Sequence, residues 1–229
     1  MTKFFVERGG RKTPLHKPED VQSFLAQGKG HWRPGYSAAE LAKAWIGCDG
    51  VPRAVRTVLD TAPDLRGAAL LEGYFEQKTP LGSRGRDSQT DLLAVFDVDG
   101  NRLVAGIEGK RDEPFGPRVR DWNDGPGKAN RLAGLCGLLE LAADQVSDLR
   151  YQLLHRTAAA LLEAEKRGAA NALVLVHSFS LKARSFDAFA AFTERLGAAV
   201  TAPGEIGPAV GRHGCRLRFG WVDDPKPLP

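Results

Sequence analysis

The chain has 229 residues, 42% of them hydrophobic, which suits one globular domain of the α/β class. No stretch approaches the roughly 18 apolar residues of a membrane-spanning helix. The first residues lack the apolar core of a secretory signal, so we expect a cytoplasmic protein that does not associate with membranes. Basic residues outnumber acidic ones by 32 to 28, and the net charge of +4 permits a polyanionic partner without requiring one. The three cysteines are far apart, which argues against a disulfide framework or a zinc site.

The first part of the chain, residues 1–62, is predicted to be mainly helical. Short amphipathic helices are expected over residues 17–28, 37–47 and 52–62, with one short edge strand over residues 3–7. A helix of about four turns is predicted over residues 64–81, because Leu65, Ala69, Glu72 and Glu76 recur at helical spacing. The two glutamates would then share one face of that helix.

Residues 91–110 are predicted to form a β-hairpin. Asp99-Gly100 is a strong signal for a two-residue turn, since both residues tolerate a positive φ. With that turn, Asp91 faces Glu108 across the strands, and Lys110 lies on the same face of the sheet. The opposite face of the hairpin is wholly apolar. A shift of one residue in the register would place the two carboxylates on different faces.

Two opposed carboxylates on a mostly buried sheet require a positive charge between them. Lys110 could supply part of that charge, and a divalent cation such as Mg²⁺ would supply more. Such a site could activate a water molecule for attack on a phosphorus atom, with Lys110 stabilising the developing charge or helping to deprotonate the water. The alternative is that these are ordinary solvated charges at the end of a strand.

A loop rich in proline and glycine follows the hairpin, and we expect it to carry function rather than core. Beyond it, helices are predicted over residues 129–145, 147–168 and 185–197, and strands over residues 171–180 and 215–224. In the helix over residues 147–168, Gln152 and Arg156 are neighbours at i,i+4, as are Tyr151 and His155. This polar cluster indicates a face turned toward the site, with Arg156 binding a phosphate, although a half-exposed helix would show the same pattern.

Aromatic and basic residues in the loops are candidates for contacts with nucleic acid. Trp122 could stack on a base, and Arg84 and Arg86 could contact phosphates. Surface arginines and aromatic residues are also common in proteins without such partners.

The order of these elements resembles the PD-(D/E)xK nuclease superfamily. A helix with glutamates comes first, then a strand that begins with an acid, then a strand with the sequence EGK at residues 108–110, and finally a helix with a glutamine. The wider sequence, including HWRPGYSAAELAKAW and EGKRDEPFGP, resembles a bacterial family of no known activity that we associate with this superfamily. The sequence departs from the superfamily pattern at Thr90, where the motif has proline, and at Arg156, where the exonuclease-type glutamine motif has tyrosine.

The resemblance implies a restriction-endonuclease-like fold, a central mixed β-sheet flanked by helices, here with a helical N-terminal extension. One domain would span residues 1–229, with the nuclease-like core in residues 63–229. The implied site consists of Asp91 and Glu108 as metal ligands, Lys110 as the catalytic lysine, Glu72 or Glu76 as a further ligand, and Gln152 close by.

The function expected from this resemblance is Mg²⁺-dependent hydrolysis of phosphodiester bonds, with Mn²⁺ as a possible substitute for Mg²⁺. DNA is the expected substrate in preference to RNA. The alternative is an inactive module of the same fold that binds nucleic acid or a protein partner. A homodimer is left open, because many nucleases pair to cut both strands.

Overall fold

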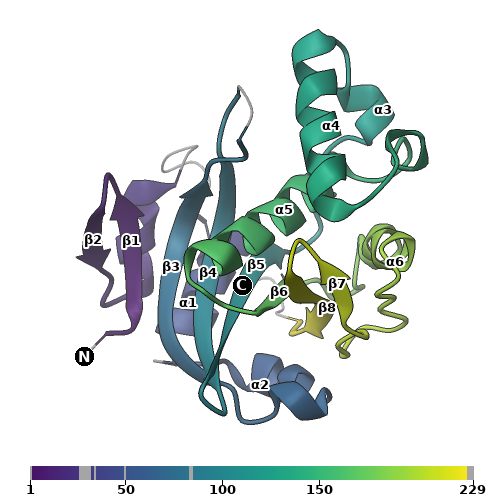
Figure 1. Cartoon of the computed structure of the whole chain (residues 1–229). Helices are drawn as coiled ribbons and strands as arrows, with labels where there is room; N and C mark the ends of the chain where they lie inside the picture. Colours follow the sequence, from purple (N-terminus) through teal and green to yellow (C-terminus); the bar gives the residue numbers. More distant parts are fainter. Residues whose placement is uncertain (1, 26–31, 34, 49, 83–84, 226–229) are drawn as a thin grey trace.

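The computed structural model describes residues 2–25, 32–33, 35–48, 50–82 and 85–225. Within this part of the chain, eight strands form one mixed sheet in the order β2-β1-β3-β4-β5-β6-β8-β7 (Figure 1). The strands are β1 (Phe4–Arg8), β2 (Arg11–Pro14), β3 (Ala69–Thr79), β4 (Ser88–Val98), β5 (Asn101–Lys110), β6 (Asn171–Ser178), β7 (Val210–Arg212) and β8 (Cys215–Asp223). The α-helices are α1 (Ser37–Ile46), α2 (Arg53–Leu59), α3 (Val119–Trp122), α4 (Pro126–Leu139), α5 (Tyr151–Lys166) and α6 (Phe186–Arg195). Short 3₁₀ turns span Pro18–Phe24, Pro63–Leu65 and Ala143–Gln145.

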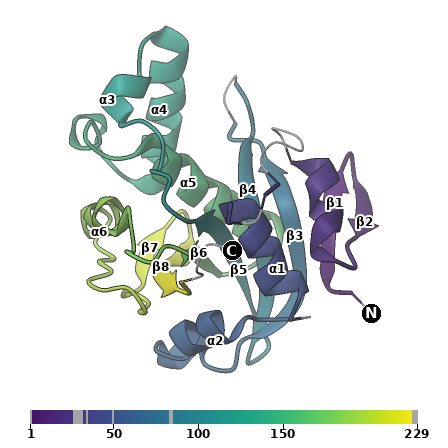
Figure 2. The same cartoon turned by 180° about the vertical axis from the view of Figure 1, so that it is seen from behind.

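Helices cover both faces of the sheet, as the two opposite views in Figures 1 and 2 show. Helices α1 and α2 pack on one face, and α5 crosses the other. Strands β3, β4 and β5 form an antiparallel meander, while β5, β6 and β8 run parallel to one another. The prediction of a mixed sheet flanked by helices is therefore confirmed.

The hairpin has the predicted turn and register. Asp99 and Gly100 both have a positive φ, of 51° and 80°, as a type I′ turn requires. The ladder runs from Val98 opposite Asn101 to Leu92 opposite Ile107. One face packs with α5, and the other packs with α1 and α2. The first core contains Leu93, Val95 and Val104, and the second contains Leu92, Ala94, Phe96, Leu103, Ala105 and Ile107.

The helix predicted over residues 64–81 is wrong, because Ala69–Thr79 form strand β3. The period of two that marks a strand is hidden here by two irregularities. The register shifts between Leu70 and Glu72, and Glu76 has a positive φ of 55°. Gly73 allows the close approach of β1, since a Cβ at this position would lie 2.7 Å from the ring of Phe4. Pairing with β1 and β4 therefore overrides the helical spacing of the side chains.

The N-terminal part differs from the predicted helical extension. Besides α1 and α2, residues 1–62 supply β1 and β2, which extend the same sheet. The strand predicted over residues 3–7 is present, but it is not an edge strand, because β2 pairs on its outer side. In the described part of the chain, no helix combines the length and apolar character that crossing a membrane requires.

Candidate functional site

Five polar side chains meet where the ends of β4 and β5 pass under the first two turns of α5. Asp91 comes from β4, Glu108 and Lys110 come from β5, and Gln152 and Arg156 come from α5. Glu108 and Lys110 are two residues apart on a strand, so both point toward the helix. Gln152 and Arg156 are four residues apart on a helix, so both point toward the sheet. The sequence-predicted residues Asp91, Glu108, Lys110 and Gln152 are thus brought together.

Glu108 is the centre of this network, which we call the carboxylate cluster. Its Oε1 accepts a hydrogen bond of 2.6 Å from Nε2 of Gln152 and lies 3.2 Å from Nζ of Lys110. Its Oε2 accepts a hydrogen bond of 2.6 Å from Nε of Arg156. Lys110 also donates to Oε1 of Gln152 at 3.2 Å, and its Nζ lies 4.9 Å from the ring centre of Phe115. Glu108 and Lys110 are both buried, so removing a partner of either would leave a charge uncompensated and destabilise the fold.

Asp91 lies beside Glu108 at the end of the ladder. Its Oδ2 accepts a hydrogen bond of 3.0 Å from the backbone N–H of Gly109, and its Oδ1 lies 3.4 Å from Nη2 of Arg156. The side chain of Asp91 is 25% exposed, whereas that of Glu108 is only 7% exposed. The guanidinium of Arg156 therefore spans both carboxylates, and the Asp91 side of the cluster is the one open to solvent.

The charges within the cluster set the pKa values of its acids. Burial and the neighbouring charge of Glu108 raise the pKa of Asp91 well above its usual range. Burial also opposes ionisation of Glu108, but the charges of Arg156 and Lys110 outweigh it and lower the pKa of Glu108 overall. Glu108 is therefore the ionised partner of the two cations, and Asp91 is the acid whose ionisation is opposed by its surroundings.

The two glutamates of β3 have different positions. Glu76 is buried, accepts a short hydrogen bond from the Gln89 amide, and interacts electrostatically with Asp91 and Glu108. Burial raises the pKa of Glu76 to about 6. Glu72 lies outside the cluster, because its carboxylate is 3.0 Å from Nζ of Lys12 and accepts a hydrogen bond from the Tyr74 hydroxyl. Of the two predicted candidates, only Glu76 approaches the cluster.

Replacing Glu76 by glutamine should stabilise the metal-free protein at neutral pH. A raised pKa means that the folded state binds the proton more tightly than the unfolded state, so the folded protein loses stability as the pH rises through about 6. The Glu76→Gln variant escapes this loss, and we expect it to gain roughly 2 kcal/mol near neutral pH. Urea unfolding should show this gain shrinking to nothing below the unfolded pKa of about 4.3. A gain that is independent of pH would contradict this account.

The donor atoms of the cluster suit a hard divalent cation. Asp91 and Glu108 both contact the guanidinium of Arg156, at Nη2 and at Nε, so their oxygens flank one cationic group, and carboxylate oxygens are what Mg²⁺ prefers. Across the described ranges, no group of three or more His, Cys, Asp or Glu side chains is arranged to hold a metal ion. Asp91 and Glu108 are therefore the two carboxylates that could hold a metal here, and Mg²⁺ keeps several waters at sites with so few protein ligands.

Comparison with known families assigns most of the chain to one family. A family described as a domain of unknown function, DUF6946, matches residues 14–226. The chain belongs to this family. No curated protein matches the chain, and no solved structure matches it either. The chemistry of this DUF6946 chain must therefore be argued from the geometry of its side chains.

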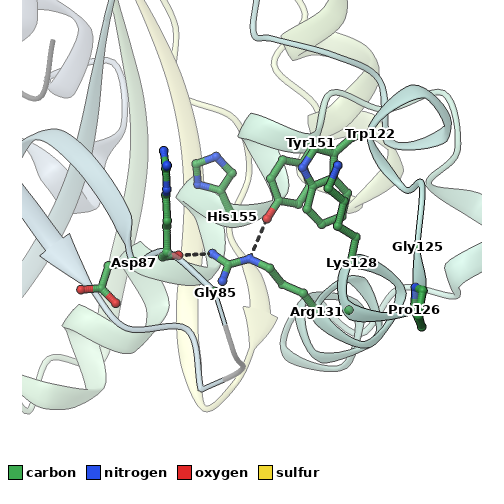
Figure 3. A pocket seen from close by; sticks show the side chains of 11 residues that line it. Gly85, Asp87, Trp122, Gly125, Pro126, Lys128, Arg131, Tyr151 and His155 are labelled. Carbon is green, nitrogen blue, oxygen red and sulfur yellow. Dashed lines mark hydrogen bonds between the residues drawn. The ribbon is translucent and has the colours of Figure 1, made fainter.

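Figure 3 shows a cleft of about 810 Å³. It adjoins the carboxylate cluster, because Ser88 contacts both His155, which lines the cleft, and Arg156. It is lined by α3, α4, the start of α5 and residues 85–87. Two of the residues predicted to contact nucleic acid, Trp122 and Arg86, line this cleft, while Arg84 lies outside the described residues. Arg156, which the sequence suggested as a phosphate ligand, contacts Asp91 and Glu108 in the carboxylate cluster.

Two residues of this DUF6946 site were missed as functional candidates. Arg131 was hidden in an apolar helix pattern, yet its Nε donates a hydrogen bond of 2.7 Å to the hydroxyl of Tyr151. Ser88 lies between the cleft and the cluster, with its Oγ 2.9 Å from Nδ1 of His155 and 3.5 Å from Nη1 of Arg156. The sequence signals for this second polar region were the spacing of Tyr151 and His155 on α5 and the loop residues Trp122 and Arg86.

Proposed function

We propose that this chain is a Mg²⁺-dependent nuclease that hydrolyses phosphodiester bonds in DNA. The observation that carries the proposal is that Asp91 and Glu108 flank one cationic group, the guanidinium of Arg156, while the amine of Lys110 lies 3.2 Å from Glu108. An ordinary solvated strand end would not bury a glutamate and a lysine side by side under a helix.

The arrangement of the chain also supports the resemblance to the PD-(D/E)xK superfamily. The aspartate lies on one strand of an antiparallel pair, the EGK sequence lies on the next, and the following helix brings its glutamine to the same point. The glutamate-bearing segment that precedes them is a strand rather than the expected helix, and Glu76 reaches the cluster from there.

Each residue has a role that its position suggests. Mg²⁺, when bound by Asp91 and Glu108, would supply a Lewis acid and a water molecule of lowered pKa. The Nζ of Lys110 is placed to hold the negative charge that develops on the phosphate or to take a proton from the attacking water. Gln152 bonds to both Glu108 and Lys110 and so fixes their relative positions. Mn²⁺ would serve in the same place, because it favours the same oxygen ligands.

The proposal is tested by incubating the purified protein with single-stranded and double-stranded DNA, with and without Mg²⁺. We expect cleavage that requires Mg²⁺ or Mn²⁺ and stops when a chelator is added. The Asp91→Asn variant should lose at least about a hundred-fold in rate, because it removes a charged metal ligand. Asp97→Asn is the matched control, since Asp97 lies on the same strand but near the turn, opposite Arg102. Equal cleavage by the wild type and the Asp91 variant would refute the proposal.

A second candidate is an inactive module of the same fold that binds nucleic acid or a protein partner. The position of Arg156 favours it, because the guanidinium already supplies the positive charge that the two carboxylates require. In that case the arginine would be a permanent structural counter-ion. The two candidates differ in whether Mg²⁺ competes with this arginine.

A further inference from the structure

The cleft beside the carboxylate cluster has a rigid aromatic wall. The rings of Trp122 and Tyr151 are stacked, with centres 3.6 Å apart and planes 11° apart. The hydroxyl of Tyr151 accepts a hydrogen bond of 2.7 Å from Arg131, and Arg131 also donates at 2.7 Å to the backbone carbonyl of Arg86 (Figure 3). Arg131 thus holds the ring of Tyr151, and the half-buried ring of Trp122 stacks on it.

The charge around this wall is mainly positive. Arg86, Lys128 and Arg131 line the cleft together with one acid, Asp87, and a second acid, Asp124, pairs with Lys128 at 2.9 Å. The Nζ of Lys128 lies 5.4 Å from the ring centre of Trp122, so a cation and an aromatic ring are presented together. Burial lowers the pKa of His155 to about 3, so this imidazole is neutral and can accept or donate a hydrogen bond at physiological pH. An aromatic, anionic ligand matches this combination of rings and cations.

The cleft and the carboxylate cluster share a wall. Tyr151 and His155 face the cleft, while the next residues on α5, Gln152 and Arg156, face the cluster. Ser88 bridges the two regions through its contacts with His155 and Arg156. A strand whose phosphate lies at Asp91 and Glu108 would therefore have a neighbouring nucleotide next to the cleft.

We propose that this cleft binds one unpaired nucleotide of a single-stranded DNA segment, with the base against the Trp122–Tyr151 ring pair and a phosphate near Lys128. This inference rests on the proposed function and adds the substrate class. Aromatic rings bind single strands because the faces of unpaired bases are free, whereas duplex bases are stacked on one another. A volume of about 810 Å³ lies within the range of pockets that enclose small ligands.

The test is fluorescence anisotropy in chelator-containing buffer, so that no cleavage occurs. The probes are a labelled thymidine oligomer of about 12 nucleotides and a duplex of the same length. We expect the single strand to bind on the order of ten-fold more tightly than the duplex. Trp122→Ala should weaken binding of the single strand by on the order of ten-fold, and Lys128→Ala should weaken it less. Lys166→Ala is the matched control, because Lys166 is exposed in the last turn of α5, and it should bind like the wild type.

A second measurement keeps the inference testable if Trp122→Ala does not fold. The oligomer should quench part of the intrinsic tryptophan fluorescence, and the conservative variant Trp122→Phe should lose that part of the signal. Duplex binding as tight as single-strand binding, or quenching that is the same in the Trp122→Phe variant, would overturn the inference. If the single strand binds as expected but no Mg²⁺-dependent cleavage is found, the proposed function is refuted and the inference about the cleft is kept. Cleavage that depends on Asp91 but not on Trp122 would support the proposed function and refute binding of a nucleotide in the cleft.

Discussion

Methionine in place of Lys110 should lower the rate of Mg²⁺-dependent DNA cleavage by about a thousand-fold, a loss typical of removing a group that stabilises transition-state charge or transfers a proton. Methionine has nearly the same length and suits the contact with the Phe115 ring. Glu108 keeps its hydrogen bonds from Gln152 and Arg156, so its carboxylate stays in place. The change removes the amine and costs stability, because Glu108 loses one of its two cations and Oε1 of Gln152 loses a donor, but Arg156 still compensates the Glu108 carboxylate.

The matched control for this variant is Lys78→Met. Lys78 is exposed on β3, so the substitution alters the net charge by the same amount without touching the cluster. Single-turnover cleavage rates should fall only for the Lys110 variant, and circular dichroism should show both variants folded. Comparable rates for the Lys110 variant and the wild type would show that the amine has no part in the chemistry.

Glutamine in place of Arg156 should destabilise the metal-free protein strongly, and Mg²⁺ should restore much of the loss. Arg156 pairs with Glu108 at 2.6 Å and with Asp91 at 3.4 Å, and its side chain is only 13% exposed. Removing one partner of a buried ion pair costs about 3–5 kcal/mol, because the other charge is left uncompensated. For a chain of this size that corresponds to a fall in Tm of roughly 10 °C. A divalent cation between the same oxygens would compensate them again.

Thermal unfolding with and without Mg²⁺ measures this effect and separates the two candidate functions. If the cluster is a metal site, Mg²⁺ should raise the Tm of Arg156→Gln much more than that of the wild type, in which the arginine competes with the metal. Arg195→Gln, an exposed arginine in the last turn of α6, is the matched control and should respond like the wild type. If neither Mg²⁺ nor Mn²⁺ changes the Tm of the Arg156→Gln variant, the result would favour the inactive module, in which Arg156 is the permanent counter-ion of the two carboxylates.

The hairpin could be predicted in detail because its determinants are local. The Asp99-Gly100 turn fixes the register, and the register fixes which side chains share a face. This is why Asp91 and Glu108 could be placed next to each other from the sequence alone. Gln152 was indicated in two other ways, by its i,i+4 spacing with Arg156 and by the resemblance to a nuclease superfamily, and the structure brings it to Glu108.

The determinants of β3 and of Arg156 are not local. β3 has the side-chain spacing of a helix, and only its pairing with β1 and β4 decides its conformation. The side chain of Arg156 could equally have reached solvent or a phosphate. Its position between two carboxylates follows from how closely α5 approaches β5, where Gly106 leaves room for Ala160. Such close approaches between distant segments are not encoded in any short sequence pattern.

The reverse side of β5 has a consequence for shortened versions of the protein. Between Glu108 and Lys110 lies Gly109, and a Cβ there would be 3.3 Å from the backbone oxygen of Ser37 and 3.4 Å from Leu41. The first helix thus packs directly against the back of the strand that carries Glu108 and Lys110. A fragment that starts at residue 63 would expose this apolar face to water and leave β5 without its support, so we expect a stable fragment to require the N-terminal helices.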